Sequence, residues 1–144
     1  MVRVGGKPVL ERLVDHLNNY GITEIIVNLH YKPQAIYKYF GTRLLYFYEP
    51  KLLGEIETEN RLRNWLGTDY IIANGDTLTD LNINELISYY GAMSWDKVYT
   101  GMTYRYGNCP TRKVDFKCWW QDIGTLEGLK KARLYYGCNH NTKS

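Results

Sequence analysis

Two aspartates in this chain directly follow segments predicted to be strands, and both could bind a divalent cation. Asp76 follows the apolar run Tyr70–Ala73 through the turn Asn74-Gly75. Asp122 follows an aromatic segment that ends at Trp120, and it precedes a helical pattern. Ligands of α/β sheets bind beyond the carboxyl ends of the strands, and carboxylate oxygens suit Mg²⁺ beside phosphate groups. Taken together, the two carboxylates predict a magnesium site.

Each aspartate taken alone also has a simpler interpretation. Asn74-Gly75-Asp76 could be a turn that merely ends a strand, and spacing alone gives the two interpretations of Asp76 equal weight. Asp122 alone is typical of a helix-capping residue. Gly75 permits a close backbone approach or a positive φ, so we assign it to the ligand side of the turn.

The elements that must position these residues alternate between helix and strand. Proline, glycine and asparagine mark many of the helix ends, and short apolar runs indicate buried strands. We predict helices over 8–20, 33–40, 54–66, 82–90 and 125–136, and strands over 24–29, 44–48, 70–73, 97–106 and 112–120. Asn82 or Asn84 could cap the fourth helix. This order predicts an α/β, Rossmann-like three-layer sandwich with a mostly parallel sheet. We expect one domain over 1–144, with a flexible tail at 137–144.

Composition excludes several other classes of protein. The net charge is +3, with no run of Lys or Arg, so we expect no nucleic-acid partner. We find no apolar leader and no membrane-spanning stretch. The three cysteines, Cys109, Cys118 and Cys138, form no CxxC pair, which favours reduced thiols and a cytoplasmic protein.

Four segments in order resemble the sugar-1-phosphate nucleotidyltransferases. They are VGGKPVLERLVDHLNNYGITEIIVNLHYKPQAIYKYF, YEPKLLG, DYIIANGDTLTDLNINELI and DIGTLEGLKKA. That family joins a sugar 1-phosphate to a nucleoside triphosphate and releases pyrophosphate. The resemblance implies the nucleotide-diphospho-sugar transferase fold, with Asp76 and Asp122 binding Mg²⁺ and Gly54 near the nucleotide base. It gives Lys7 a minor catalytic role on the phosphate side, and a solvated lysine remains the alternative.

The chain also departs from the family's pattern. It contains no glycine-rich GGxGTR segment, and Met1 aligns within the Pro-Lys-Pro-Leu stretch that follows that segment, so we expect the usual first strand to be missing. Glu55 and Glu57 replace small residues after Gly54, where they would repel an anionic nucleotide. The region between Gly91 and Asp122 has no room for the family's sugar-binding Glu-Lys motif.

Three hypotheses follow from this mixture. The first is a magnesium-dependent nucleotidyltransferase, of which this chain alone is weakly active or inactive. The second is a non-catalytic nucleotide-binding or regulatory paralogue, and the third is an α/β domain without a ligand.

A missing strand would leave the strands 24–29 and 70–73 with open edges, which favours a homo-oligomer. His30 could line the cleft, although a surface histidine at a strand end is the favoured interpretation.

Overall fold

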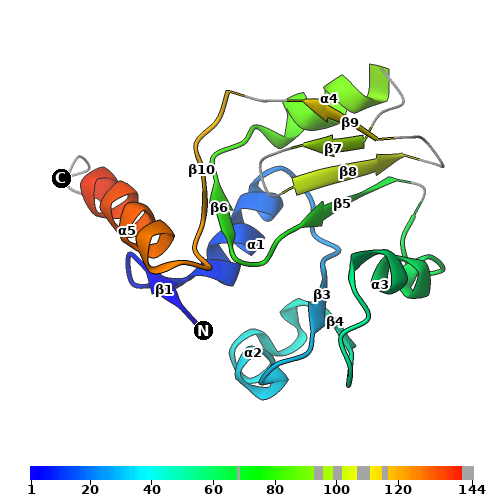
Figure 1. Cartoon of the computed structure of the whole chain (residues 1–144), viewed down its shortest axis with the longest axis horizontal. Coiled ribbons are helices and arrows are strands. Elements are labelled where there is room, and N and C mark those ends of the chain that lie inside the picture. The colour runs from blue at the N-terminus through cyan, green and yellow to red at the C-terminus, as the bar shows by residue number, and fades with distance from the viewer. Residues whose placement is uncertain (68, 93–95, 99–101, 107–110, 115–116, 141–144) are drawn as a thin grey trace.

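The structure, a computed structural model, describes residues 1–67, 69–92, 96–98, 102–106, 111–114 and 117–140 (Figure 1). Short strands and helices alternate along the first two thirds of the chain, as the sequence predicts. The elements are β1 (Arg3–Val4), β2 (Lys7–Pro8), α1 (Val9–Asn19), β3 (Ile26–Leu29), α2 (Pro33–Phe40), a 3₁₀ turn (Gly41–Arg43), β4 (Leu45–Tyr48), α3 (Glu55–Leu62), β5 (Asp69–Ala73), β6 (Thr77–Thr79), α4 (Ile83–Ala92), β7 (Asp96–Val98), β8 (Met102–Tyr106), β9 (Thr111–Val114), β10 (Trp120–Asp122) and α5 (Leu126–His140).

The residues that mark helix ends act as the sequence predicts. Pro8 immediately precedes α1, and Gly21 follows the end of that helix with a φ of 80°, which favours glycine. Asn82 is the cap of α4, because its side-chain oxygen accepts the backbone N–H groups of Asn84 at 3.0 Å and Glu85 at 3.4 Å. These local signals confirm the starts of α1 and α4.

Other boundaries differ from the prediction. The expected strand 97–106 contains two strands, β7 and β8, and β10 follows β9 as a separate strand. Helix α3 ends at Leu62 rather than at Leu66. Helix α5 continues to His140, so the first half of the expected flexible tail is helical, and 141–144 lie outside the described residues.

The strand pairs are mixed in direction. β3 pairs with β4 and β7 with β9 in parallel, whereas β1 pairs with β2, β5 with β8 and β6 with β10 antiparallel. Apolar runs mark strands but do not set their direction, which is why the sequence alone predicts a more parallel sheet. Within the described residues, β3 and β5 are each bonded to one neighbouring strand only.

Helix α1 organises the core. Its buried side chains contribute to each of three apolar clusters, which join it to the residues around α4, to α5 with β1 and β6, and to α2 with β4. The buried members of these clusters are Val4, Val9, Leu13, Val14, Leu17, Phe40, Leu44, Leu78, Leu81, Ile83, Leu86 and Ala132. Because β6 and α5 both pack on α1, this helix fixes the part of the molecule that carries Asp76 and Asp122 (Figure 1).

The helices and the cysteines can be compared with the expectations from the sequence. No helix in the described ranges is both long enough and apolar enough to cross a membrane. Cys118 is a free, half-buried thiol, and its burial raises its pKa. The side chains of Cys109 and Cys138 lie outside the described residues.

Candidate functional site

Strand pairing brings the two predicted aspartates together. In the antiparallel β6–β10 ladder, Asp122 is the register partner of Thr77, the residue after Asp76. The ladder continues one residue further, because the N–H of Ile123 donates to the carbonyl oxygen of Asp76 at 3.0 Å. Two residues that are 46 positions apart in sequence therefore meet at one end of a short two-stranded ribbon.

The two carboxylates face a common space beside Gly124. A methyl group added at Gly124 would lie 3.0 Å from Oδ1 of Asp122 and 3.6 Å from Oδ2 of Asp76. The two oxygens cannot be further apart than the sum of these distances, so both carboxylates border the same space. Both side chains are exposed, so a ligand can reach them from solvent.

The segment after Asp122 is held in a tight turn. The N–H of Gly124 donates to Oδ1 of Asp122 at 2.5 Å, and Thr125 caps α5 by accepting the N–H of Gly128 at 3.0 Å. The helix-capping interpretation of Asp122 is therefore wrong, and Thr125 has that role. A methyl group at Gly128 would lie 2.0 Å from the carbonyl oxygen of Asp122, so only glycine lets α5 pack this close.

Gly75 and Lys7 have more ordinary surroundings than the sequence suggests. Gly75 does not have a positive φ, and a methyl group there would meet only Leu10 of α1, at 3.9 Å. The amino group of Lys7 lies 2.5 Å from a carboxylate oxygen of Asp15. This hydrogen bond raises the pKa of Lys7, so the lysine stays charged but already has an anionic partner.

Gly54 lies in another part of the molecule. It precedes α3 with a φ of 86°, a conformation that favours glycine, and Glu55 and Glu57 occupy the first turn of that helix. Helix α3 is on the opposite side of the molecule from α5 in Figure 1, with β6 and β10 between them. The structure therefore brings Asp76 and Asp122 together but shows no contact between them and Gly54 in the described part of the chain.

Glu49 is a buried carboxylate that the sequence analysis did not single out. Its exposed fraction is 1%, and its backbone N–H donates to the carbonyl oxygen of Leu29 at 2.8 Å. Its carboxylate accepts hydrogen bonds from the hydroxyl of Thr58 and from the N–H of Leu53 at 3.2 Å. Glu49 thus ties the loop before Gly54 to both β3 and α3.

The pKa of Glu49 reflects two opposing effects. Burial raises it, but the hydrogen bonds from Thr58 and Leu53, with further contributions from Asn28 and His30, leave the net pKa below its ordinary value of 4.5. His30 also contacts the backbone oxygen of Glu49 through Nδ1 at 2.8 Å. Because a carbonyl only accepts, Nδ1 carries the proton, and His30 supports the loop at the end of its strand.

Replacing Glu49 should lower the stability of the fold, and the size of this effect should depend on pH. We expect Glu49→Gln to lower the free energy of unfolding at pH 7 by about 1–3 kcal/mol, because the amide cannot accept both hydrogen bonds equally well. A carboxylate whose pKa is lower in the folded state than in the unfolded state stabilises the fold at pH values above its unfolded-state pKa. This stabilisation is lost as the pH falls through the folded-state pKa. Urea unfolding should therefore show a gap between wild type and variant that shrinks below pH 4.5. The exposed Glu24→Gln is the control, and a gap that stays constant down to pH 3 would contradict this account.

The donor set at the carboxylate pair is small. Among the described residues, no group of three or more His, Cys, Asp and Glu side chains could hold a metal ion. Two carboxylates nevertheless fit Mg²⁺, which commonly takes one or two carboxylates and completes its octahedron with phosphate oxygens and water.

Comparison with known proteins finds similar sequences over part of the chain. No family model matches the chain. Over 100 residues it is 27% identical to the bifunctional protein GlmU of Methanococcus maripaludis strain C7, which covers 68% of this chain and 24% of that protein. Over 91 residues it is 29% identical to D-glycero-alpha-D-manno-heptose 1-phosphate guanylyltransferase of Campylobacter jejuni, which covers 60% of this chain and 41% of that protein. These similarities support the resemblance to sugar-1-phosphate nucleotidyltransferases that the sequence predicts.

The relationship to sugar-1-phosphate nucleotidyltransferases extends to the fold. The crystal structure of HddC from Yersinia pseudotuberculosis superimposes with a TM-score of 0.78 at 17% identity and covers 94% of this chain and 88% of that chain. This likeness confirms the nucleotide-diphospho-sugar transferase fold expected from the sequence. The chain spans only about a quarter of the length of the GlmU relative and less than half of the guanylyltransferase.

Proposed function

We propose that this chain serves in magnesium-dependent nucleotidyl transfer, in which a sugar 1-phosphate and a nucleoside triphosphate give a nucleotide sugar and pyrophosphate. The observation that carries the proposal is the convergence of Asp76 and Asp122 on the space beside Gly124. The relatives support the reaction class, since one of them is named as a heptose 1-phosphate guanylyltransferase.

Asp76 and Asp122 would hold the cation from two sides. The tight turn at Gly124 and the close packing of Gly128 on the carbonyl of Asp122 fix the backbone at and after Asp122, which limits the motion of its carboxylate. A bound Mg²⁺ would supply charge neutralisation and orientation for phosphate oxygens. The pair cannot supply the basic groups that stabilise charge on a transferring phosphoryl group.

Gly54 and Lys7 have smaller parts in this proposal. Gly54 would lie near the nucleotide base, and Glu49 would keep its loop in place through the hydrogen bond to Leu53. Lys7 would contribute to the phosphate side only by leaving Asp15. We propose no base or sugar specificity, because no described contact selects one.

Metal binding tests the proposal directly. We expect Mn²⁺, used as a paramagnetic substitute for Mg²⁺, to bind the wild-type chain in the presence of a nucleoside triphosphate. Asp76→Asn and Asp122→Asn should each weaken this binding about tenfold or more, since each removes one of two anionic ligands. Electron paramagnetic resonance of free Mn²⁺ gives the affinity, and chelation by EDTA should reverse the binding.

The matched control is Asp69→Asn, an exposed aspartate at the start of β5. This variant should bind Mn²⁺ as the wild type does. Equal affinities for all four proteins would contradict the assignment of the cation to Asp76 and Asp122. Circular dichroism should show that the variants remain folded, because both carboxylates are exposed.

A further inference from the structure

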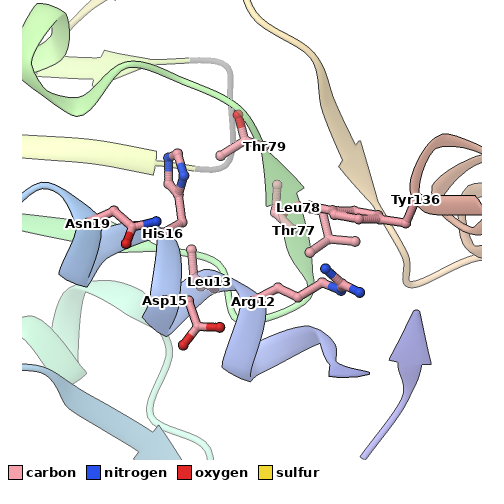
Figure 2. A pocket seen from close by; sticks show the side chains of 9 residues that line it. All are labelled: Arg12, Leu13, Asp15, His16, Asn19, Thr77, Leu78, Thr79 and Tyr136. Atoms are coloured by element: carbon pink, nitrogen blue, oxygen red, sulfur yellow. The ribbon is translucent and has the colours of Figure 1, made fainter. Parts of the chain in front are cut away.

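A cavity of about 170 Å³ opens between α1, β6 and α5 (Figure 2). Neither Asp76 nor Asp122 lines it. The side chains around it come from three elements and are mostly polar, with the ring of Tyr136 closing one side. The cavity is smaller than the range of about 300–1,000 Å³ usual for larger ligands, so its occupant is smaller than a nucleotide.

The hydroxyl of Thr77 at this cavity is buried, and no described residue is its hydrogen-bond partner. Thr77 is 3% exposed, and within the described part of the chain its side chain makes no hydrogen bond. Thr79, two residues along the same strand, donates to the carbonyl oxygen of Trp119 at 3.0 Å and accepts the N–H of Leu81 at 3.1 Å. A buried hydroxyl without a partner costs about 1–3 kcal/mol, so a bound molecule is a physical explanation for Thr77.

Arg12 gives the cavity a fixed positive charge. Its Nε donates to the carbonyl oxygen of Val4 at 2.8 Å, and Nη2 donates to that of Gly5 at 2.9 Å. Its guanidinium lies 4.0 Å from the ring centroid of Tyr136. Among the described residues Arg12 makes no ion pair. A guanidinium has five N–H donors, and the bonds to Val4, to Gly5 and to the hydroxyl of Tyr136 do not use all of them.

The other charged groups at the cavity do not cancel Arg12. Asp15 lines the cavity, but its carboxylate is paired with the amino group of Lys7 at 2.5 Å. His16 directs Nε2 to the carbonyl oxygen of Leu81 at 2.9 Å, which makes that nitrogen a donor. Asn19 adds an amide on the same side of α1 as His16 (Figure 2).

We infer that this cavity binds a small oxyanion, the phosphate or carboxylate group of a molecule smaller than a nucleotide. Arg12 is the charged partner of the oxyanion, and the hydroxyl of Thr77 donates to one of its oxygens. Planar guanidinium groups bind both anions well, and their hydrogen bonds to anions are about twice as strong as neutral ones. Thr77 follows Asp76 in β6, but neither Asp76 nor Asp122 lines the cavity, so the oxyanion site is a different site from the magnesium pair.

The test is titration with inorganic phosphate, and separately with acetate, in metal-free buffer that contains EDTA and little salt. Isothermal titration calorimetry of the whole chain should give a dissociation constant in the low-millimolar range for at least one of the two anions. This range corresponds to a binding free energy of about −4 kcal/mol. Phosphate binding alone would assign the site to phosphate esters, and acetate binding alone to carboxylates. Failure of both anions to bind would overturn the inference.

Thr77→Val is the decisive variant, because it keeps the shape of the side chain and removes only the orphan hydroxyl. It should weaken anion binding about fivefold or more without lowering the melting temperature. Asp15→Asn should strengthen binding, since it frees Lys7 and removes a negative charge. Arg63→Gln, which changes an exposed arginine at the end of α3, is the matched control and should bind as the wild type does. If Thr77→Val binds equally well, or unfolds at a clearly lower temperature, the hydroxyl does not serve a ligand.

Discussion

Assayed as the 144-residue chain, the protein is expected to release pyrophosphate at less than about 10⁻² per second from any nucleoside triphosphate and sugar 1-phosphate. Ordinary enzymes turn over at about 1–1,000 per second, and a positioned arginine alone contributes about 10³–10⁵-fold in phosphoryl transfer. The chain has no GGxGTR segment to supply such a group. Lys7, the nearest candidate, is already paired with Asp15.

The experiment is a coupled pyrophosphate assay with the four common nucleoside triphosphates and a panel of sugar 1-phosphates. A parallel protein should carry a strand and GGxGTR loop from a related enzyme fused ahead of Met1. We expect this fusion to raise the rate by a factor of about 10³ or more, because it restores the phosphate clamp. Asp76→Asn in the fusion should remove that gain.

An ordinary turnover by the unfused chain would contradict this prediction. Lys7→Gln then becomes the informative variant, because loss of activity would show that Lys7 leaves Asp15 to act on phosphate. Retained activity would direct attention to Arg12, whose guanidinium makes no ion pair among the described residues.

The sequence predicts the parts of the fold that depend on local signals. Pro8, Gly21 and Asn82 mark helix ends through their own backbone or side-chain chemistry, and the structure agrees at each position. The apolar run at 70–73 likewise becomes β5. These signals require no knowledge of distant residues, which is why they can be read from the sequence.

The geometry of the site depends on long-range pairing that leaves no local signal. β6 has only three residues, Thr-Leu-Thr, which is too short for a periodic pattern to identify. Its pairing with β10 is nevertheless what brings Asp76 to Asp122. The sequence therefore predicts both aspartates from their positions at strand ends and from the family resemblance. It does not predict the pairing of β6 with β10 that brings them together.

Glu49 and Thr77 show the same limit for side chains. Glutamate is rarely buried unless it is paired, so its burial follows only from the positions of Thr58 and Leu53. The unpartnered hydroxyl of Thr77 is likewise recognisable only when its surroundings are known. The sequence shows which side chains are polar, but only the folded structure shows which of them are buried and which have hydrogen-bond partners.

The chain is expected to associate in solution through the open edges of β3 and β5. The sequence allows three outcomes for these strands, namely direct pairing, a strand from a partner, or open edges that aggregate. Within the described residues β3 and β5 are not paired with each other, because β3 is bonded only to β4 and β5 only to β8. Unpaired edges of apolar strands present rows of N–H and C=O groups that readily accept another strand.

Light scattering on dilute protein measures the association, and we expect a mass of at least twice 16.9 kDa at micromolar concentrations. Hydrogen exchange locates it: the amide of Asn28 in β3, which faces away from β4, and the amides of β5 that face away from β8 should exchange more slowly as concentration rises. Amides of α5, which has no open strand edge, provide the internal control. A 16.9 kDa monomer with a single cooperative thermal transition would contradict the prediction and show that the two edges are tolerated in water.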